Sequence, residues 1–430
     1  MRDKEKVERL VAEGKHFCMV PWVHLHTTAL GNMSPCMSLV EGSEASGYGN
    51  LNENSFHELW QGERIRKLRL RMLEDKASFN CKKCYERESV GYWSQRTDAN
   101  KKYGHYLDWV VSTDEKGYAP DAKPIYWDIR FSNLCNLKCR MCSYSASSAW
   151  YEDAIELGQI DPKEVTKKVS GVENTAPLLD ELEQYMPHLE KVHFAGGEPL
   201  LLNENTHILE RLKHYEKFDT DIKYNTNLTT LKHKGKNITE LWEPFNNIKL
   251  NVSIDGVEKR CEYVRKNLKW NTFVQNIAEV KSKTNVKVII NITVSIFNIL
   301  QLREIHHYML EHNYIEIDHI CLNLLHSPEE YSIKILPIEV KEVVTSQLQE
   351  HVSWLKEQEP YKSNSSVENT ESLEQWEAII SYMNSGDWSS LIPKFIESTA
   401  KLDLLRDEKL LDVFPELNVL YMHKEAGVSV

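Results

Sequence analysis

Apolar residues recur in short runs between residues 121 and 337, and stretches of helical periodicity separate these runs. Six runs have the length and composition of buried strands: Ile125–Phe131, Lys191–Ala195, Asp221–Asn225, Lys249–Ile254, Val286–Ser295 and Asp318–Leu324. The helical stretches between them include Leu202–Tyr215, Trp270–Lys283 and Ile299–Asn313. Strands joined by helical crossovers predict a parallel sheet, and right-handed crossovers curl such a sheet into an open barrel. We therefore expect an α/β fold with a partial (β/α)6 barrel.

The residues before this region predict a small α+β domain. Trp22–Thr28 alternates as a strand does, and Met33–Met37 returns as its hairpin partner. Ser55-Phe-His-Glu58 is a capping box, which predicts a helix running to about Leu73. The expected organisation is an N-terminal domain at 1–95, a linker with a short strand or helix at 96–120, the barrel at 121–337 and a helical extension at 338–430.

Composition narrows the class of protein. The 430 residues are 41% hydrophobic, which suffices for a large core, and no window approaches 18 consecutive apolar residues. The net charge of -12 disfavours sequence-independent binding to nucleic acid. The N-terminus is charged rather than signal-like, and the odd count of nine cysteines with metal-like spacing favours a reducing compartment. We expect a cytoplasmic protein without a membrane span. Because only about 17 residues precede Cys18, we expect no separate leader-peptide-binding domain before it.

Three cysteines lie in one short stretch at the end of the first barrel strand. Cys135, Cys139 and Cys142 have the spacing C-x3-C-x2-C, which lets three thiolates bind three irons of a cubane cluster. The fourth iron is then open to a chelating cofactor or substrate. A zinc or disulfide site is the alternative, but zinc usually takes four ligands. The motif resembles the radical S-adenosylmethionine (radical SAM) superfamily, whose open iron binds the amino and carboxylate groups of S-adenosylmethionine.

The resemblance implies a set of cofactor contacts at the carboxyl ends of the next strands. Gly196-Gly-Glu-Pro199, which comprises Gly196, Gly197, Glu198 and Pro199, resembles the motif whose backbone receives the methionine amino group. Asn225, Thr226 and Asn227 match the segment that usually touches the ribose. The next motif is Ser253-Ile-Asp255-Gly, and Arg265 follows it. In related enzymes a serine and an arginine at the places of Ser253 and Arg265 bind the methionine carboxylate.

Four further cysteines precede the barrel: Cys18, Cys36, Cys81 and Cys84. With Gly49-Asn-Leu and the capped helix carrying Trp60, they resemble the twitch domain, a shortened relative of the SPASM domain. The resemblance implies an auxiliary 4Fe–4S cluster, and structural zinc is the alternative. Such domains usually follow the barrel, whereas this one precedes it. His24 and His26 alternate onto one face of the hairpin, and we expect them to be surface residues or residues behind the ligands.

Polar residues alternate with apolar ones in the last two predicted strands. Asn291, Thr293 and Ser295 alternate with Ile292, Val294 and Ile296. His319, Cys321 and Asn323 alternate in the same way with Ile320, Leu322 and Leu324. If the apolar set packs against the outer helices, the polar set faces the barrel interior and predicts a polar substrate. Two cysteines are candidate hydrogen-atom donors to a substrate radical. One is Cys321, and the other is Cys261, which lies four residues before Arg265 on the same predicted helical face. A buried cysteine is more often a small hydrophobe.

The resemblance implies an enzyme that reductively cleaves S-adenosylmethionine to methionine and a 5′-deoxyadenosyl radical, which abstracts hydrogen from substrate. An auxiliary cluster favours a net oxidation of a polar small molecule or peptide, with flavodoxin or ferredoxin as the electron donor. Redox-neutral epimerisation or rearrangement, and peptide maturation, stay open as alternatives. A non-catalytic protein that binds S-adenosylmethionine or metal is the alternative from another class.

Overall fold

The computed structural model describes residues 2–38, 48–89, 94–163, 165–283, 285–363 and 367–427, with side chains omitted at 367–371 and 424–427. The chain divides into two compact units. The first comprises Met1–Leu134, Lys168–Tyr224 and Gly235–Ile248, and the second comprises Cys135–Lys167, Asn225–Lys234 and Lys249–Val430. This division differs from the predicted domains because the N-terminal segment shares a sheet with the first barrel strands.

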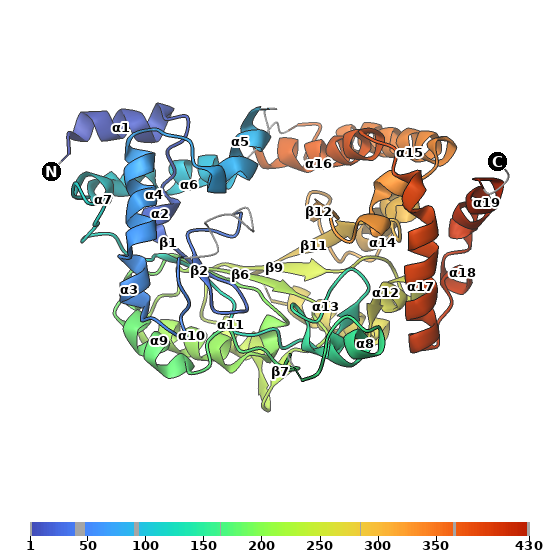
Figure 1. Cartoon of the computed structure of the whole chain (residues 1–430), viewed down its shortest axis with the longest axis horizontal. Coiled ribbons are helices and arrows are strands. Elements are labelled where there is room, and N and C mark those ends of the chain that lie inside the picture. Colours follow the sequence, from blue (N-terminus) through green and yellow to red (C-terminus); the bar gives the residue numbers. More distant parts are fainter. Residues whose placement is uncertain are drawn as a thin grey trace. The chain divides into compact units, whose positions relative to one another are not determined.

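In the first unit, neighbouring strands follow the order β6-β5-β3-β1-β2. Their bounds are Asp221–Thr226, Lys191–Phe194, Tyr126–Ile129, His24–Thr27 and Met33–Ser34. Of these, β6, β1 and β2 are labelled in Figure 1. All adjacent pairs are parallel except β1 with β2. The helices of this unit are α1 (Lys4–Glu13), α2 (Val20–Val23), α3 (Phe56–Trp60), α4 (Glu63–Leu73), α5 (Lys82–Ser89), α6 (Gln95–Tyr103), α7 (Leu107–Val111), α9 (Thr175–Glu183), α10 (Asn203–His214) and α11 (Ile238–Trp242), and a short strand β8 spans Lys236–Asn237.

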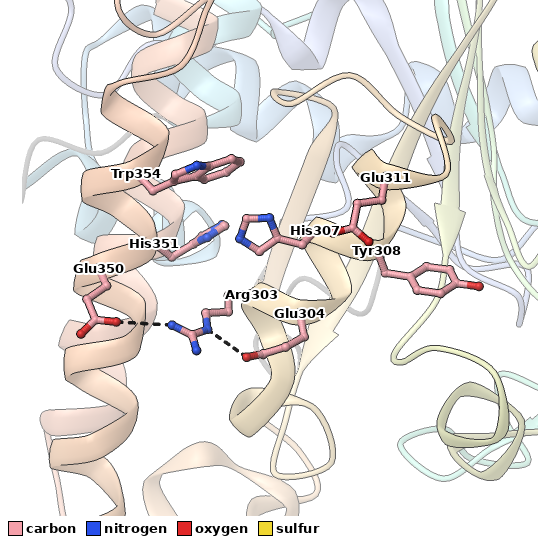
Figure 2. Close-up of a pocket in the computed structure, with 8 residues that line it drawn as sticks. All are labelled: Arg303, Glu304, His307, Tyr308, Glu311, Glu350, His351 and Trp354. Atoms are coloured by element: carbon pink, nitrogen blue, oxygen red, sulfur yellow. Dashed lines mark hydrogen bonds and ion pairs between the residues drawn. The ribbon is translucent and has the colours of Figure 1, made fainter.

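In the second unit, β9 (Ile248–Ser253), β11 (Val286–Val294) and β12 (Ile320–Leu324) are neighbours in that order, and β11 and β12 are parallel. A second, two-stranded sheet pairs β4 (Lys138–Cys139) with β10 (Arg265–Lys266). The remaining elements are β7 (Lys232–His233), α8 (Tyr151–Glu156), α12 (Lys259–Val264), α13 (Trp270–Lys281), α14 (Leu302–Glu311), α15 (Ile338–Lys356), α16 (Val367–Asn384), α17 (Ile392–Arg406), α18 (Leu410–Val413) and α19 (Asn418–Gly427). A surface groove runs between α14 and α15 (Figure 2).

All six predicted barrel strands are confirmed within one or two residues, and so are the predicted helices that match α10 and α13. The helix predicted at Ile299–Asn313 is present as α14, which begins at Leu302 after a 3₁₀ turn at Ile299–Gln301. The alternation in β11 is confirmed as far as Val294, because Ile292 and Val294 are buried whereas Asn291 and Thr293 are half-buried. It is wrong for Ser295, which is fully buried. The helical C-terminal extension is present as α15 to α19.

The predictions for the N-terminal segment need correction. Trp22 lies in the short helix α2, which begins next to Pro21, and the strand starts only at His24. The capping box at Ser55 is present, but the predicted single helix is broken into α3 and α4 at Gly62, whose backbone is extended. The hairpin partner is limited to Met33 and Ser34.

The N-terminal strand is not part of a separate sheet. β1 runs parallel to β3 with His24 opposite Tyr126 and His26 opposite Asp128. The predicted linker also contains the helices α6 and α7, and α6 begins with its own capping box at Ser94. The residues before the barrel motifs are therefore integrated into the α/β sheet of the first unit. No described helix is long and apolar enough to traverse a lipid bilayer.

Candidate functional site

The three barrel cysteines lie on a short, well-braced loop of the second unit. Cys139 belongs to β4, and the backbone N–H of Cys142 donates to the Cys139 carbonyl at 3.0 Å. The indole of Trp150 donates to the same carbonyl at 2.7 Å, and the Cys135 N–H donates to the Ser148 hydroxyl at 3.2 Å. Burial raises the pKa of the Cys139 and Cys142 thiols. A bound cationic metal would offset this by favouring the thiolate forms.

Arg265 lies directly beside this loop. It is the register partner of Cys139 across the β4–β10 pair, and its Nη1 is 3.8 Å from the Cys139 sulfur. Its Nη2 is 2.7 Å from Oδ2 of Asp255, which is fully buried. The structure thus brings together Arg265, Asp255 and Cys139. In the described chain Arg265 already has a carboxylate partner.

The guanidinium nevertheless keeps one donor available. Its Nε is buried and has no hydrogen-bond partner among the described residues. Burial alone would lower the pKa of Arg265. Asp255 and Cys139 outweigh this and raise the pKa, so the side chain is cationic. The other oxygen of Asp255 accepts from the backbone N–H of Thr293 at 2.8 Å, which fixes the carboxylate. A buried cationic donor beside the cysteine loop fits a carboxylate-bearing cofactor.

The segment that follows β6 also reaches the cysteine loop. Nδ2 of Asn227 donates to the Asn136 side chain at 3.0 Å and is 4.0 Å from the Cys135 sulfur. Oδ1 of Asn225 is buried without a partner in the described residues, and the Thr226 hydroxyl accepts from the Leu228 N–H. Ser253 is half-buried at the last position of β9.

The glycine motif belongs to the first unit and packs on the residues just before Cys135. Gly196 has a φ of +126°, and a Cβ on Gly197 would lie 2.2 Å from the Leu134 carbonyl oxygen. The N–H groups of Gly197 and Glu198 donate to the carbonyls of Ser132 and Leu134, at 3.2 and 2.7 Å. Glycine is therefore required at both positions, by the backbone conformation of Gly196 and by the close approach of Gly197. Pro199 is buried at the start of a 3₁₀ turn.

The four N-terminal cysteines line one apolar cavity of the first unit. They come from three separate segments: Cys18 precedes α2, Cys36 follows β2, Cys81 directly precedes α5, and Cys84 lies in the first turn of α5. Burial raises the pKa of the Cys18 thiol well above its usual value, and the neighbouring Cys81, Cys36 and Cys84 add to the shift. In the described ranges, no three Cys, His, Asp or Glu residues are placed to hold a single metal ion. Four thiols around one cavity form the donor set of a fully ligated iron–sulfur cluster.

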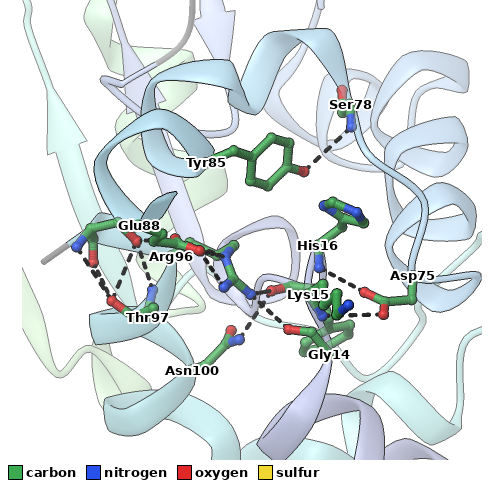
Figure 3. Close-up of polar contacts among 12 residues, drawn as sticks. Gly14, Lys15, His16, Asp75, Ser78, Tyr85, Glu88, Arg96, Thr97 and Asn100 are labelled. Carbon is green, nitrogen blue, oxygen red and sulfur yellow. Dashed lines mark hydrogen bonds and ion pairs between the residues drawn. The ribbon is translucent and has the colours of Figure 1, made fainter. Parts of the chain in front are cut away.

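Arg96 is the main residue of this site that sequence reasoning missed. Figure 3 shows its guanidinium between Glu88 and Gly14. Nη1 donates to the carbonyls of Gly14 and Phe17, both at 2.9 Å, and Nε donates to Glu88 at 2.9 and 3.1 Å. Phe17 directly precedes Cys18, and Glu88 lies one helical turn beyond Cys84. Arg96 therefore ties the Cys18 loop to the helix that carries Cys84.

The loop before Cys18 has further polar supports. The carboxylate of Asp75 accepts from the N–H groups of Lys15 and His16, at 3.1 and 2.7 Å, and Asn100 bonds to both Phe17 and Met19 (Figure 3). The hydroxyl of Tyr85, next to Cys84, accepts from the Ser78 N–H at 3.3 Å. These contacts hold the cavity wall without using the cysteine sulfurs.

A row of buried ionisable groups crosses the first unit, and it includes His24 and His26, for which the surface alternative is wrong. Both are buried rather than at the surface. Nδ1 of His26 and Nδ1 of His193 lie 3.2 and 3.5 Å from Oδ2 of Asp128. Nδ1 of His24 lies 3.0 Å from the carbonyl of Pro35, which precedes Cys36. These buried groups thus extend along the sheet from the cavity that the four N-terminal cysteines line.

The protonation of this row follows from its neighbours. An Nδ1 that faces a carboxylate or carbonyl oxygen carries the proton, so the opposite Nε2 is an acceptor. Nε2 of His24 and of His193 is buried without a partner in the described chain. Burial lowers the pKa of His24 to about 3 and also lowers the pKa of His193. Burial alone would raise the pKa of Asp128. His193 and His26 outweigh this and hold the pKa well below its usual range.

The two candidate hydrogen-atom donors differ in environment. Cys261 on α12 is fully buried, and burial raises the pKa of its thiol. Cys321 is half-buried opposite Asn291. Nδ2 of Asn323 donates to Oδ1 of Asn291 at 2.7 Å and lies 3.6 Å from the Cys321 sulfur. The polar face of β11 and β12 therefore carries Cys321, whereas Cys261 is enclosed.

Protein-family models match both regions of the chain that carry the cysteine sites. The model of the radical SAM superfamily matches residues 129–309, and that of an iron–sulfur cluster-binding domain, SPASM, matches residues 18–85. The chain carries a radical SAM domain. The superfamily resemblance, the α/β fold and the N-terminal position of the cluster-binding domain are confirmed. These domains support an enzyme and imply a 4Fe–4S cluster, S-adenosylmethionine and an auxiliary iron–sulfur cluster.

Solved structures resemble this radical SAM protein at low identity. They include anSMEcpe with bound AdoMet (18% identity, 52% of this chain and 59% of that one, TM-score 0.37). Two others are anSMEcpe with AdoMet and the Kp18Cys peptide (17%, 55% and 66%, TM-score 0.33) and SuiB from Streptococcus suis (13%, 68% and 62%, TM-score 0.35). The chain thus spans about three fifths of the first of these structures. No curated protein matches the chain.

Proposed function

We propose that this radical SAM enzyme catalyses a net oxidation of a polar substrate and that its auxiliary cluster accepts an electron. The observation that carries this proposal is the apolar cavity lined by Cys18, Cys36, Cys81 and Cys84. Four thiolates ligate every iron corner of a cubane, so no iron is left to chelate substrate. Such a cluster is suited to electron transfer.

In this proposal Cys135, Cys139 and Cys142 hold the catalytic cluster. With S-adenosylmethionine bound, such a cluster would supply the one-electron chemistry that cleaves the cofactor and gives a hydrogen-abstracting 5′-deoxyadenosyl radical. Arg265 contributes its unpartnered Nε to the methionine carboxylate, with Ser253 beside it, while Asp255 holds the guanidinium in place. The remaining cofactor contacts are assigned to Gly196–Pro199 and to Asn225–Asn227.

A net oxidation also releases a proton, and the buried histidine row supplies an acceptor. When a carbinol or amine loses a hydrogen atom and then an electron, the remaining proton must pass to a base. Nε2 of His193 is a buried acceptor, and Asp128 stabilises the imidazolium that would form. The substrate is proposed to be a polar small molecule or a peptide, and the electron donor a flavodoxin or ferredoxin.

A redox-neutral radical reaction is the second candidate, and one observation favours it. Cys321 is half-buried on the polar face of β12, where its thiol can return a hydrogen atom to a substrate radical. Cys261 is less suited to this role because it is fully enclosed.

The first experiment measures 5′-deoxyadenosine from the anaerobically reconstituted chain with dithionite and S-adenosylmethionine. Wild-type protein is expected to form it, and Cys139→Ala is expected to form none. Cys261→Ala is the matched control, because it removes a thiol from the same unit without touching the proposed ligands. Formation of 5′-deoxyadenosine by Cys139→Ala at the wild-type rate would contradict the assignment.

A further inference from the structure

The groove between α14 and α15 has a defined lining. Its walls are Arg303, Glu304, His307, Tyr308 and Glu311 from α14, and Glu350, His351 and Trp354 from α15. Figure 2 shows His307, His351 and Trp354 directed toward one another from the two helices. The groove encloses about 600 Å³ and lies entirely in the second unit. None of its residues belongs to the proposed cofactor sites.

A chain of hydrogen bonds fixes the protonation of the groove's buried histidine. Nε2 of His306 lies 3.1 Å from the carbonyl of Ile317 and therefore carries a proton. Nδ1 of His306 is then an acceptor, and it lies 3.0 Å from Nε2 of His351, which must donate. Nδ1 of His351 is left with a lone pair. Burial lowers the pKa of His306 to about 4 and that of His351 to about 3, so both rings are neutral at pH 7.

That lone pair has no partner within the described chain. His351 is 2% exposed, and its Nδ1 is a buried atom without a hydrogen bond. A buried acceptor without a partner costs free energy, which a ligand carrying an N–H donor would recover. The lining of the groove therefore includes one buried acceptor that has no partner among the described residues.

The walls beside this acceptor are aromatic. The ring centroids of His351 and Trp354 are 5.3 Å apart with nearly parallel planes, and that of His307 is 4.5 Å from Trp354. Trp354 and His307 are half-buried, so part of each ring faces the groove. A Trp face attracts cations through its quadrupole.

The rim carries excess negative charge. Glu304, Glu311 and Glu350 supply three carboxylates against the one guanidinium of Arg303. Arg303 lies between Glu304 and Glu350, at 2.9 and 3.4 Å (Figure 2). Glu311 stands one helical turn beyond His307, away from Arg303. An anionic ligand would be repelled by this rim.

We propose that this groove binds an organic cation of the guanidinium or primary-amine class. Such a ligand donates an N–H to Nδ1 of His351, stacks its cationic group on Trp354 and pairs with Glu311 and Glu350. A single metal ion fits less well, since no three metal-ligating side chains converge among the residues that the structure describes. The site is separate from the radical chemistry, so the inference does not depend on the proposed function.

Calorimetry with agmatine as the probe tests the inference on the full-length chain. We expect saturable binding of one agmatine, weakening as salt rises. Glutarate, which carries two carboxylates on a short chain, should not bind. The double variant Glu311→Gln with Glu350→Gln should lower the affinity about tenfold, and Trp354→Ala should lower it further.

The matched control is Glu339→Gln with Glu342→Gln, which removes the same charge from exposed positions of α15 outside the groove. This control should bind agmatine as the wild type does. The inference is overturned if agmatine does not saturate, if glutarate binds equally well, or if the groove variants and the control variant retain the same affinity.

Discussion

Replacement of Arg96 by Met tests whether the auxiliary site depends on the polar contacts behind its cysteines. The substitution keeps much of the apolar length of the side chain but removes its charge and its hydrogen bonds. Glu88 and the carbonyls of Gly14 and Phe17 would lose their donor. The side chains of Arg96 and Glu88 are only 10% and 18% exposed, so water replaces these bonds poorly.

The expected loss of unfolding free energy follows from the burial of the Arg96–Glu88 ion pair. Removing one partner of a buried ion pair typically costs about 3–5 kcal/mol, because the other charge stays buried without compensation. The partial exposure of Glu88 places the expected loss near the lower end, at about 3 kcal/mol. Replacing both partners by apolar residues avoids the orphaned charge, so Arg96→Met with Glu88→Met should lose less than Arg96→Met alone.

The assay is urea unfolding of the metal-free chain, followed by iron analysis after anaerobic reconstitution. Arg96→Met should lower the unfolding free energy and retain about half of the iron, because the Cys18 loop is no longer held beside α5. Arg87→Met, on the exposed side of α5, removes the same charge and should do neither. Equal stability of the Arg96 and Arg87 variants, with full iron in both, would refute the reasoning.

Three further predictions concern other parts of the chain. Arg265→Ala should weaken S-adenosylmethionine binding by about 1.5–3 kcal/mol and leave the iron content unchanged, and an unchanged affinity in equilibrium binding would point to another arginine. His306 has a native pKa of about 4 against about 6.5 when unfolded, so the unfolded state alone binds its proton between these values. Stability should therefore fall by about 2 kcal/mol more in wild type than in His306→Gln between pH 6.5 and 5.0, and parallel urea curves for the two proteins would refute this. Cys81→Ala with Cys84→Ala should still yield 5′-deoxyadenosine but little oxidised product, and product at the wild-type ratio to 5′-deoxyadenosine would favour the redox-neutral reaction.

The sequence predicted the features that depend on local pattern. The barrel strands were found because each is a short apolar run bounded by turns, and the capping box at Ser55 needs only four consecutive residues. The four N-terminal cysteines were grouped by type and order, and the structure places them around one cavity. Their roles as ligands stay predictions.

The features that sequence reasoning missed depend on contacts between distant residues. Arg96 lies 79 residues from Phe17, and an isolated arginine in the sequence carries no sign of its buried partners. For His24 and His26 the sequence left open whether they lie at the surface or behind the ligands, because the pairing of β1 with β3 that buries them is not encoded nearby. The break at Gly62 depends on an extended backbone at one glycine, a conformation that helix propensity does not reveal.

The central claim is that the chain holds two iron–sulfur clusters on two separate cysteine sets. Iron, sulfide and zinc analysis of anaerobically prepared wild type, beside the Cys135→Ala, Cys139→Ala and Cys142→Ala triple variant, tests it most directly. The account predicts about eight irons in wild type, about four in the triple variant and no zinc in either. About four irons with one zinc in wild type, or eight irons retained in the triple variant, would contradict it.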